Sequence, residues 1–434
     1  MIPSALALGF AAALGLGAAP AQADSLTSAS FGMLSNGTEV TQYTLTNANG
    51  VSVKFISLGG CITAIDVPDR HGRFANIVLG YHSLAGYDTN NTYFGGIIGR
   101  YANRIAKGTF TLEGKTYHLP VNNGVNSLHG GTTGFNLQMW KVTPKEVDHG
   151  VAAVLTYTSP DGQDGYPGTL NMTVTYTLED SNALRIDYEA TTDKPTVVNF
   201  TSHDYFNLRG NGTGSVLGEL LQINSRSYTP TDATQIPTGK IAPVAGTPMD
   251  FRKLTPIGAR IRYPFKQLLL AHGYDHNWVL NKPEPGAMSF AAEAYDPWSG
   301  RIIRCYTTEP GIQVYAGNCL DGTVLGSSGT IYRQGDAFTL ETQHYPDSPS
   351  EPSFPSTELK PGQAFHSTTI FRFSTDGEIG SCLTGIAKRY QEHADPIAPP
   401  APLRPPMASQ GAERENGDRA ASADRAGTRY DVRL

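Results

Sequence analysis

The stretch LNMTVTYTLEDSNALRIDY, residues 170–188, decides the fold class of this 434-residue chain. In its first part, every second residue from Leu170 to Leu178 is apolar, and an Asn or Thr lies between each pair. The same alternation resumes from Leu184 to Tyr188, after the polar residues 179–182. A period of two is typical of strands with one buried face, so the stretch predicts a β-hairpin.

Further short strands are predicted on both sides of this hairpin. The candidates are residues 110–119, turning at 113–115, and residues 154–158, 302–306 and 312–315. Helical periodicity is scarce, with short turns expected within 254–271 and a longer helix within 378–393. Many short strands separated by Gly, Pro, Asn and Asp predict an all-β fold, a large antiparallel β-sandwich with few short helices.

The two ends of the sequence differ from this pattern. Residues 5–19 form an apolar run, followed by Pro20 and the A-x-A pattern of residues 21–23, which is typical of a cleaved secretory signal peptide. From Asp395 onward the chain is rich in proline and then in charge, a composition that cannot bury a core and predicts disorder. The predicted organisation is a signal peptide at 1–23, one globular domain at 24–394 and a tail at 395–434, in a secreted or periplasmic protein.

Charge and cysteine content exclude several classes of protein. The net charge of −6 argues against a nucleic-acid partner, and no segment after the leader is long and apolar enough to span a membrane. Cys61, Cys305, Cys319 and Cys382 are dispersed without a C-x-x-C motif, which argues against zinc-ribbon and thioredoxin sites. Cys305 and Cys319 are the nearest pair, and both a disulfide and buried free thiols remain open for them. We expect a monomer or a dimer.

Several clusters of polar, titratable and aromatic residues stand out as candidate functional segments. They are GRYANRI at 99–105, NSLHGG at 126–131, TSHDYFNL at 201–208, GYDHNW at 273–278, GIQVY at 311–315 and ETQHYPD at 341–347. Aromatic faces combined with fixed hydrogen-bonding groups suit a hydroxyl-rich ligand such as a sugar.

Each of these residues also has an ordinary structural interpretation. Arg100 and Arg104 could be a solvated pair, Asp275 could cap a turn, and Glu341 could be the exposed end of a strand. The Gly130-Gly131 pair could be only a turn.

Taken together, four of the clusters resemble the aldose 1-epimerase family, also called the galactose mutarotases. The matching runs are GRxANRI at Gly99, LHGG at Leu128, TxHxYFNL at Thr201 and ETQxxPD at Glu341, in the family's order and spacing. The resemblance extends from about residue 32 to residue 373, and it implies a large antiparallel β-sandwich that interconverts the α and β anomers of free hexoses such as glucose and galactose.

The resemblance also implies roles for individual residues. His203 would be the general acid that protonates the ring oxygen, and Glu341 the general base that takes the proton of the anomeric hydroxyl. The residues implied in sugar binding are Asn103, Arg104, His129, Tyr205, Asp275 and Gln313. Opening and reclosing a hemiacetal needs only two proton transfers, so we expect a small aldose as the partner and neither metal nor cofactor.

Three other functions remain as alternatives. A glycoside hydrolase could use Asp275 and Glu341 as its carboxylate pair, and a non-catalytic sugar-binding protein could have the same sandwich. A metal site could draw on His129, His203, His276 and His344. His272 and His276 have H-x-x-x-H spacing, but the residues between them, 273–275, predict a loop rather than the helix such a motif needs.

Overall fold

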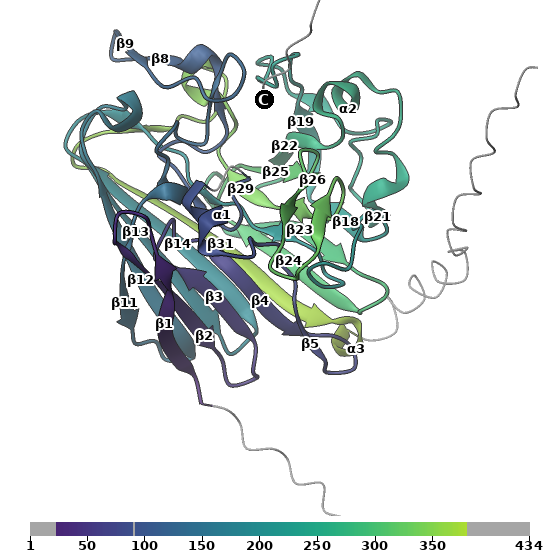
Figure 1. Ribbon diagram of the computed structural model, residues 1–434. Helices are drawn as coiled ribbons and strands as arrows, with labels where there is room; N and C mark the ends of the chain where they lie inside the picture. Colours follow the sequence, from purple (N-terminus) through teal and green to yellow (C-terminus); the bar gives the residue numbers. More distant parts are fainter. Residues whose placement is uncertain (1–22, 90–91, 380–434) are drawn as a thin grey trace, which may run out of the picture. The chain divides into compact units, whose positions relative to one another are not determined.

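A computed structural model describes residues 23–89 and 92–379 of the chain (Figure 1). Residues 1–22 of the predicted signal peptide and all of the predicted tail at 395–434 lie outside the described residues, so both remain predictions. Of the helix predicted at 378–393, only the start is described, within α3 (Asp376–Ile379).

The predicted hairpin at 170–188 is confirmed and lies in the largest sheet. Its strands are β13 (Leu170–Glu179) and β14 (Ala183–Thr192), which pair antiparallel with Leu178 opposite Leu184. The sheet has nine strands in the order β11-β12-β13-β14-β31-β24-β23-β18-β21. The other bounds are β11 (Lys141–Lys145), β12 (Gly150–Ser159), β31 (Ala364–Thr375), β24 (Arg301–Thr307), β23 (Ser289–Tyr295), β18 (Leu220–Ile223) and β21 (Thr255–Pro256).

Two five-stranded sheets form the other layer of the sandwich (Figure 1). The first consists of β1 (Ser25–Met33), β2 (Glu39–Thr46), β3 (Ser52–Ile56), β4 (Ile62–Pro68) and β5 (Phe74–Asn76). The second consists of β20 (Ala242–Pro243), β19 (Ser225–Thr229), β22 (Asp275–Leu280), β25 (Gly311–Tyr315) and β29 (Glu341–Gln343), in this order. All paired strands in these sheets are antiparallel, so the predicted sandwich is confirmed.

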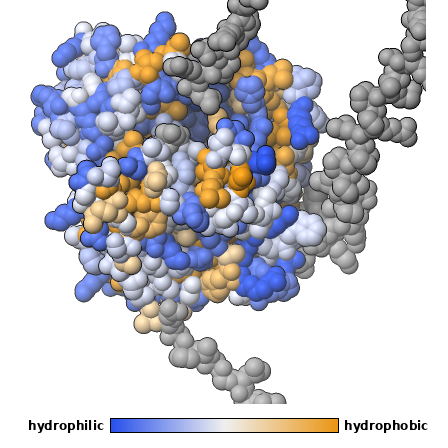
Figure 2. Space-filling view, in the orientation of Figure 1, coloured by the Kyte–Doolittle hydropathy of each residue, from blue (hydrophilic) through white to orange (hydrophobic). Residues whose placement is uncertain are grey.

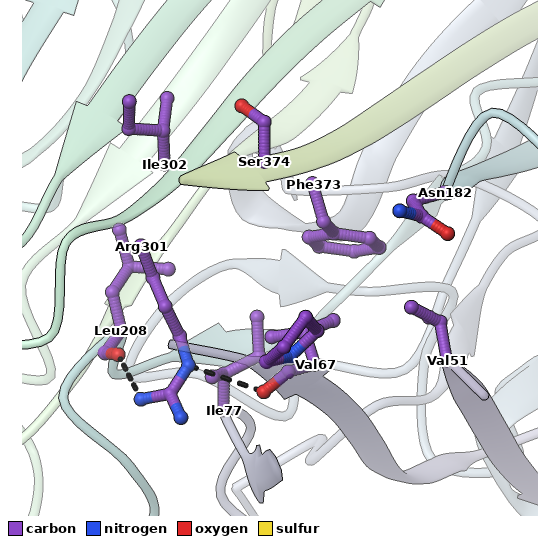
Figure 3. Close-up of a pocket in the computed structure, with 10 residues that line it drawn as sticks. Val51, Val67, Ile77, Asn182, Leu208, Arg301, Ile302, Phe373 and Ser374 are labelled. Carbon is purple, nitrogen blue, oxygen red and sulfur yellow. Dashed lines mark hydrogen bonds between the residues drawn. The ribbon is translucent and has the colours of Figure 1, made fainter. Parts of the chain in front are cut away.

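One continuous apolar core joins the three sheets. It contains Val53 of β3, Val174 of β13 and Ile312 of β25, all fully buried. A buried arginine also links the layers: Arg301 at the start of β24 donates from Nε to the carbonyl oxygen of Val67 in β4 and from Nη1 to that of Leu208 (Figure 3). The cavity beside this guanidinium measures only about 10 Å³, so it is part of the packing and not a ligand site.

Most of the smaller predicted elements are also confirmed. The hairpin at 110–119 consists of β8 (Thr109–Leu112) and β9 (Lys115–His118), and the helical turns within 254–271 include α2 (Lys266–Ala271). Residues 273–274 are not helical and β22 begins at Asp275, in agreement with the loop predicted between His272 and His276. Among the described cysteines, Cys305 is a buried free thiol and Cys319 an exposed one, so these two do not form a disulfide.

The surface carries hydrophobic residues in separate patches between hydrophilic ones on the face shown in Figure 2. Within residues 23–89 and 92–379, no helix has the length and hydropathy needed to cross a membrane.

Candidate active site

A polar cavity of about 470 Å³ lies where the end of the second five-stranded sheet meets the loops that precede and follow β10 (Ser127–Leu128). This volume is in the usual range for a small-molecule site. Seven of the eight site residues predicted from the sequence line it: Asn103, Arg104, His129, His203, Tyr205, Asp275 and Glu341. The eighth, Gln313, is not a lining residue, but its Nε2 donates to Asp275 Oδ1 at 2.6 Å.

Strand register places the acidic residues on the cavity side of the sheet. Gln313 of β25 lies directly opposite Glu341 of β29, and Tyr315 lies opposite Asp275 of β22. Directly paired residues in an antiparallel sheet point to the same face, and so do residues two apart along a strand. Asp275, Gln313, Tyr315 and Glu341 therefore share one face. Glu341 is 2 % exposed, so its interpretation as an exposed strand end is wrong.

Two segments with left-handed backbone bring Asn103 and His129 together. Asn103 has φ 64° and His129 φ 52°, and β7 (Arg104–Ile105) pairs with β10 between them. The backbone of His129 donates to the carbonyl oxygen of Asn103 at 3.1 Å, and Asn103 N–H donates back to His129 Nδ1 at 3.2 Å. Gly130 is required here, because a Cβ on it would lie 2.0 Å from the carbonyl oxygen of Gly99.

The same contact fixes the tautomer of His129. Because Asn103 N–H donates into Nδ1, the neutral ring carries its proton on Nε2. Burial, with His203 and Arg104 nearby, holds the pKa of His129 well below its usual value, so the ring stays neutral. His129 is therefore a hydrogen-bond donor to whatever occupies the cavity.

His203 lies between two very short strands that hold its backbone. It follows β16 (Thr201–Ser202), which pairs with β6 (Ile97–Ile98), and precedes β17 (Tyr205–Phe206). Its N–H donates to the carbonyl oxygen of Gly96 at 3.1 Å, and its own carbonyl accepts from Gly95 N–H at 2.9 Å. The ring of Tyr205 stacks on the imidazole with centroids 5.0 Å apart, and the Tyr205 hydroxyl donates to the carbonyl oxygen of Thr92.

His203 and Glu341 form a buried acid–base pair. His203 Nε2 lies 3.6 Å from Glu341 Oε2, and the two side chains are 5 % and 2 % exposed. Thr339 Oγ1 donates to Glu341 Oε1 at 2.8 Å, whereas Oε2 has no hydrogen-bond partner among the described residues. Burial lowers the pKa of His203 to about 4 and raises that of Glu341 to about 8. Titratable groups perturbed in opposite directions within one cavity are typical of acid–base catalysis.

Arg104 and Asp275 form the charged part of the cavity. Arg104 Nη2 lies 3.5 Å from Asp275 Oδ2, and Arg104 Nε donates to Asn123 Oδ1 at 3.0 Å. Both side chains are mostly buried, so Arg104 is not part of a solvated pair. Arg100 is also buried, but it donates to the backbone carbonyls of Pro167 and Gly168 and has a structural role.

The cavity contains a cluster of three potential metal ligands. The ligand atoms of His129, His203 and Glu341 lie within 4.8 Å of one another, the one such cluster found among the described residues. His129 does not fit a metal, because the proton on Nε2 leaves no lone pair there to donate. The other histidines of the metal hypothesis lie apart: His276 accepts from Asp275 N–H at Nδ1, and His344 Nδ1 lies 2.6 Å from Glu309 Oε2.

Thr339, which contacts Glu341, and two tyrosines of the cavity wall were not identified as site residues from the sequence. Thr339 ends β28 (Phe338–Thr339) two residues before Glu341, and this spacing was an available signal. Tyr315 lies in the GIQVY cluster and lines the cavity. Tyr93 also lines the cavity, and nothing in its local sequence marks it.

Comparison with known proteins gives consistent results. The family model for aldose 1-epimerase matches residues 41–372. A galactose mutarotase from Rattus norvegicus is 44 % identical over 350 residues, covering 81 % of this chain and 99 % of the relative. An aldose 1-epimerase from Escherichia coli K12 is 37 % identical over 333 residues, covering 76 % and 94 %. The crystal structure of a galactose 1-epimerase from Lactobacillus acidophilus has a TM-score of 0.72 at 28 % identity and covers 81 % of this chain and 99 % of that one.

Proposed function

The chain belongs to the aldose 1-epimerase family, and from this premise we propose that it interconverts the α and β anomers of free aldohexoses such as galactose and glucose. The observation that carries the proposal is the buried pair of His203 Nε2 and Glu341 Oε2, 3.6 Å apart in a cavity large enough for a hexose. The protein is thus a carbohydrate isomerase that needs no group beyond its own side chains for the proton transfers.

The reaction requires two coupled proton transfers. Glu341 takes the proton of the C1 hydroxyl while His203 gives a proton to the ring oxygen, and the bond between C1 and the ring oxygen breaks. Rotation about the C1–C2 bond presents the other face of the aldehyde. The ring then recloses with the transfers reversed: Glu341 returns its proton to O1 and His203 recovers its own, so the enzyme regains its starting state.

The pair carries one proton in total around neutral pH. Burial disfavours charge, so in the empty cavity the proton lies on Glu341 and His203 is neutral. The reactive arrangement, imidazolium beside carboxylate, has the same net charge and differs only in the position of that proton. An anomeric hydroxyl that donates to Glu341 Oε2 stabilises the carboxylate, so sugar binding shifts the proton to His203.

The remaining cavity groups suit a polyhydroxylated ring. His129 Nε2–H and the Arg104 guanidinium are donors, and the Asp275 carboxylate is an acceptor for sugar hydroxyls. Gln313 and Arg104 hold Asp275 through its two oxygens, so its position does not depend on the ligand. The ring of Tyr315 in the cavity wall provides apolar surface for the C–H faces of the sugar.

The test is the exchange of anomers by the purified protein. Freshly dissolved α-galactose and α-glucose should reach equilibrium rotation faster with the protein than without it, in proportion to protein concentration. Methyl α-galactoside is the control, because its capped O1 has no proton for Glu341 and the epimerase must leave it intact. Release of methanol or of nitrophenol from aryl galactosides would instead identify a glycoside hydrolase, and binding of galactose without faster exchange would identify a sugar-binding protein.

We also propose that the protein is exported, on the basis of the apolar run at 5–19 and the A-x-A pattern at 21–23. The mature chain then begins at or near Asp24. Intact-mass measurement on protein from the native host should give a mass without residues 1–23, and retention of these residues would contradict export.

A further inference from the structure

Tyr93 lies against both histidines of the cavity. Its ring centroid is 4.5 Å from that of His129 and 5.8 Å from that of His203, and the two imidazoles are 5.1 Å apart. The tyrosine itself is half-buried and lines the cavity wall. The ring of His203 therefore has two tyrosine neighbours, Tyr93 and Tyr205, besides the imidazole of His129.

The backbone of Tyr93 is held in an unfavourable conformation. Its φ is 61°, in the left-handed region that a bulky side chain rarely adopts. Two tyrosine hydroxyls hold the residue before it: Thr92 N–H donates to Tyr81 Oη at 3.1 Å, and Tyr205 Oη donates to the carbonyl oxygen of Thr92 at 2.8 Å. Strain of this kind persists only where the surroundings enforce it, and it is concentrated at functional sites.

The segment that carries Tyr93 is bonded directly to the backbone of His203. The carbonyl oxygen of Tyr93 accepts from Gly96 N–H at 3.1 Å, and Gly95 and Gly96 exchange hydrogen bonds with His203. The turn therefore fixes the imidazole in two ways, through the backbone of His203 and through the tyrosine ring.

We propose that Tyr93 is a positioning residue of the catalytic centre, whose strained backbone presses its ring against His129 and His203, keeps water from their imidazoles and holds them oriented for proton transfer. This role rests on the proposed function of the same cavity. The ring, and not the hydroxyl, is the part that acts. The low pKa of His203, which burial produces, depends in part on this ring.

The main variant is Tyr93→Asn. Asparagine tolerates positive φ better than tyrosine, so this change removes the ring while it relieves backbone strain. We expect folding to be retained, kcat for anomer exchange to fall about 10–100-fold because the imidazole is misplaced, and KM to change less. The acid limb of the pH profile of kcat/KM, which reports the free enzyme, should move up toward the ordinary histidine pKa. Tyr93→Gly, which also suits positive φ, is the second ring-deleting variant.

Two controls separate this role from a purely structural one. Tyr93→Phe keeps the ring and should recover most of the kcat that Tyr93→Asn loses, together with the wild-type acid limb. Tyr117→Asn removes a half-buried ring of β9 that stacks on Phe110 outside the cavity, and it should change stability without moving the acid limb.

Three outcomes would overturn the proposal. The first is an unchanged kcat and acid limb in both ring-deleting variants, and the second is a loss in Tyr93→Phe as large as that in Tyr93→Asn. The third comes from NMR titration of the His203 imidazole, which needs no turnover: its pKa should rise in Tyr93→Asn, and an unchanged value would contradict the role of the ring. Absence of anomer exchange in the wild type would instead contradict the proposed function and leave this titration as a separate test.

Discussion

The chemistry of this chain depends on single atoms whose environments differ sharply over a few ångströms. Glu341 Oε1 accepts a hydrogen bond from Thr339, while Oε2, 3.6 Å from His203, accepts none from the described residues. A buried carboxylate oxygen without a hydrogen-bond partner costs folding free energy. Oε2 is therefore the oxygen that is free to accept a hydrogen bond from a hydroxyl of the ligand. Oε1 therefore anchors the side chain through Thr339, and Oε2 is left to accept the proton of the ligand.

Substitution of the two catalytic groups should abolish most of the exchange without loss of binding. Glu341→Gln keeps the shape of the side chain but not its basic site, and His203→Asn removes the transferable proton. We expect each to lower kcat by about 10²–10⁴-fold, the usual effect of a positioned proton-transfer group. Asp275→Asn should mainly raise KM, since Asp275 accepts from the sugar. Polarimetry beside calorimetric binding of galactose measures both effects.

The hydrolase alternative predicts a different order for the same three variants. In a hydrolase that uses the two carboxylates, Asp275→Asn would lower kcat as much as Glu341→Gln, and His203→Asn would lower it only slightly. A folded His203→Asn variant with near-normal exchange would remove His203 from the proposed mechanism.

The pH dependence of kcat/KM, which reports the free enzyme, should be bell-shaped. The pair holds one proton between the pKa of His203, about 4, and that of Glu341, about 8. Below the lower limit His203 is protonated as well as Glu341, so neither group can accept the proton of the anomeric hydroxyl. Above the upper limit the single proton is lost, so activity falls on both sides. The measurement is the enzymatic rate after subtraction of spontaneous mutarotation, which acid and base accelerate. An acid limb near the ordinary histidine value of about 6.5 would show that His203 is hydrated in the free enzyme.

Most site residues could be predicted from the sequence because they lie in distinctive runs such as GRYANRI and TSHDYFNL. Tyr93 could not, because its role depends on a positive φ and on contacts with rings 36 and 110 residues away in the chain, His129 and His203. The burial of Arg100 was equally hidden, since most of its hydrogen-bond partners are backbone carbonyls, which carry no sequence signal.

At the level of elements, strands with a visible apolar alternation were predictable, and the two-residue strands around the site were not. β13 and β14 each have ten residues, enough to display the alternation of one buried face. β6, β16 and β17, which hold His203, have two residues each, too few for any periodicity to be seen. These short strands depend on their neighbours in space, so they become visible only in the folded chain.

The turn after β10 offers a matched test of how tightly an element positions the site. Gly130→Ala places a Cβ 2.0 Å from the carbonyl oxygen of Gly99 at φ +91°, whereas Gly124→Ala at φ +61° meets nothing within 4 Å. Gly124→Ala should lower the free energy of unfolding by about 1–2 kcal/mol, the cost of a left-handed alanine. Gly130→Ala should lower it more and also raise KM, because the turn carries His129. Urea denaturation measures the free energy of unfolding of the two variants, and steady-state kinetics measures their KM. Equal effects of the two substitutions would show that the turn at Gly130 relaxes to accommodate the added Cβ.

At the level of the whole molecule, several buried acids make stability depend on pH. Asp204 is 1 % exposed, accepts from Ser202 Oγ at 2.8 Å through Oδ2, and has no partner for Oδ1 in the described part of the chain. Burial raises its pKa to about 7, above the value of about 3.9 for an unfolded aspartate. Since the folded state holds this proton more tightly, the contribution of Asp204 to stability declines as pH rises from about 4 to about 7.

Asp204→Asn should therefore stabilise the protein relative to the wild type, and by more at pH 8 than at pH 4.5. At pH 4.5 the carboxyl is neutral in the folded state and the variant should differ little from the wild type, whereas at pH 8 it should unfold with a free energy higher by a few kcal/mol. Urea denaturation at the two pH values measures the difference. The same difference at both pH values would show that Asp204 is not titrated on folding.

The arrangement of β22, β25 and β29 also limits how this site can change. Asp275 and Glu341 lie on the outer two of three adjacent strands, so two interstrand spacings, about 10 Å, and an offset of two residues along the strands separate their backbones. Backbone hydrogen bonding sets that spacing, and side-chain substitution does not alter it. Asn103, Arg104 and His129 lie instead on turns and a two-residue strand, outside the regular hydrogen bonding of that sheet. New sugar preferences should therefore arise in these connections, and a library for altered specificity belongs there and not in the sheet.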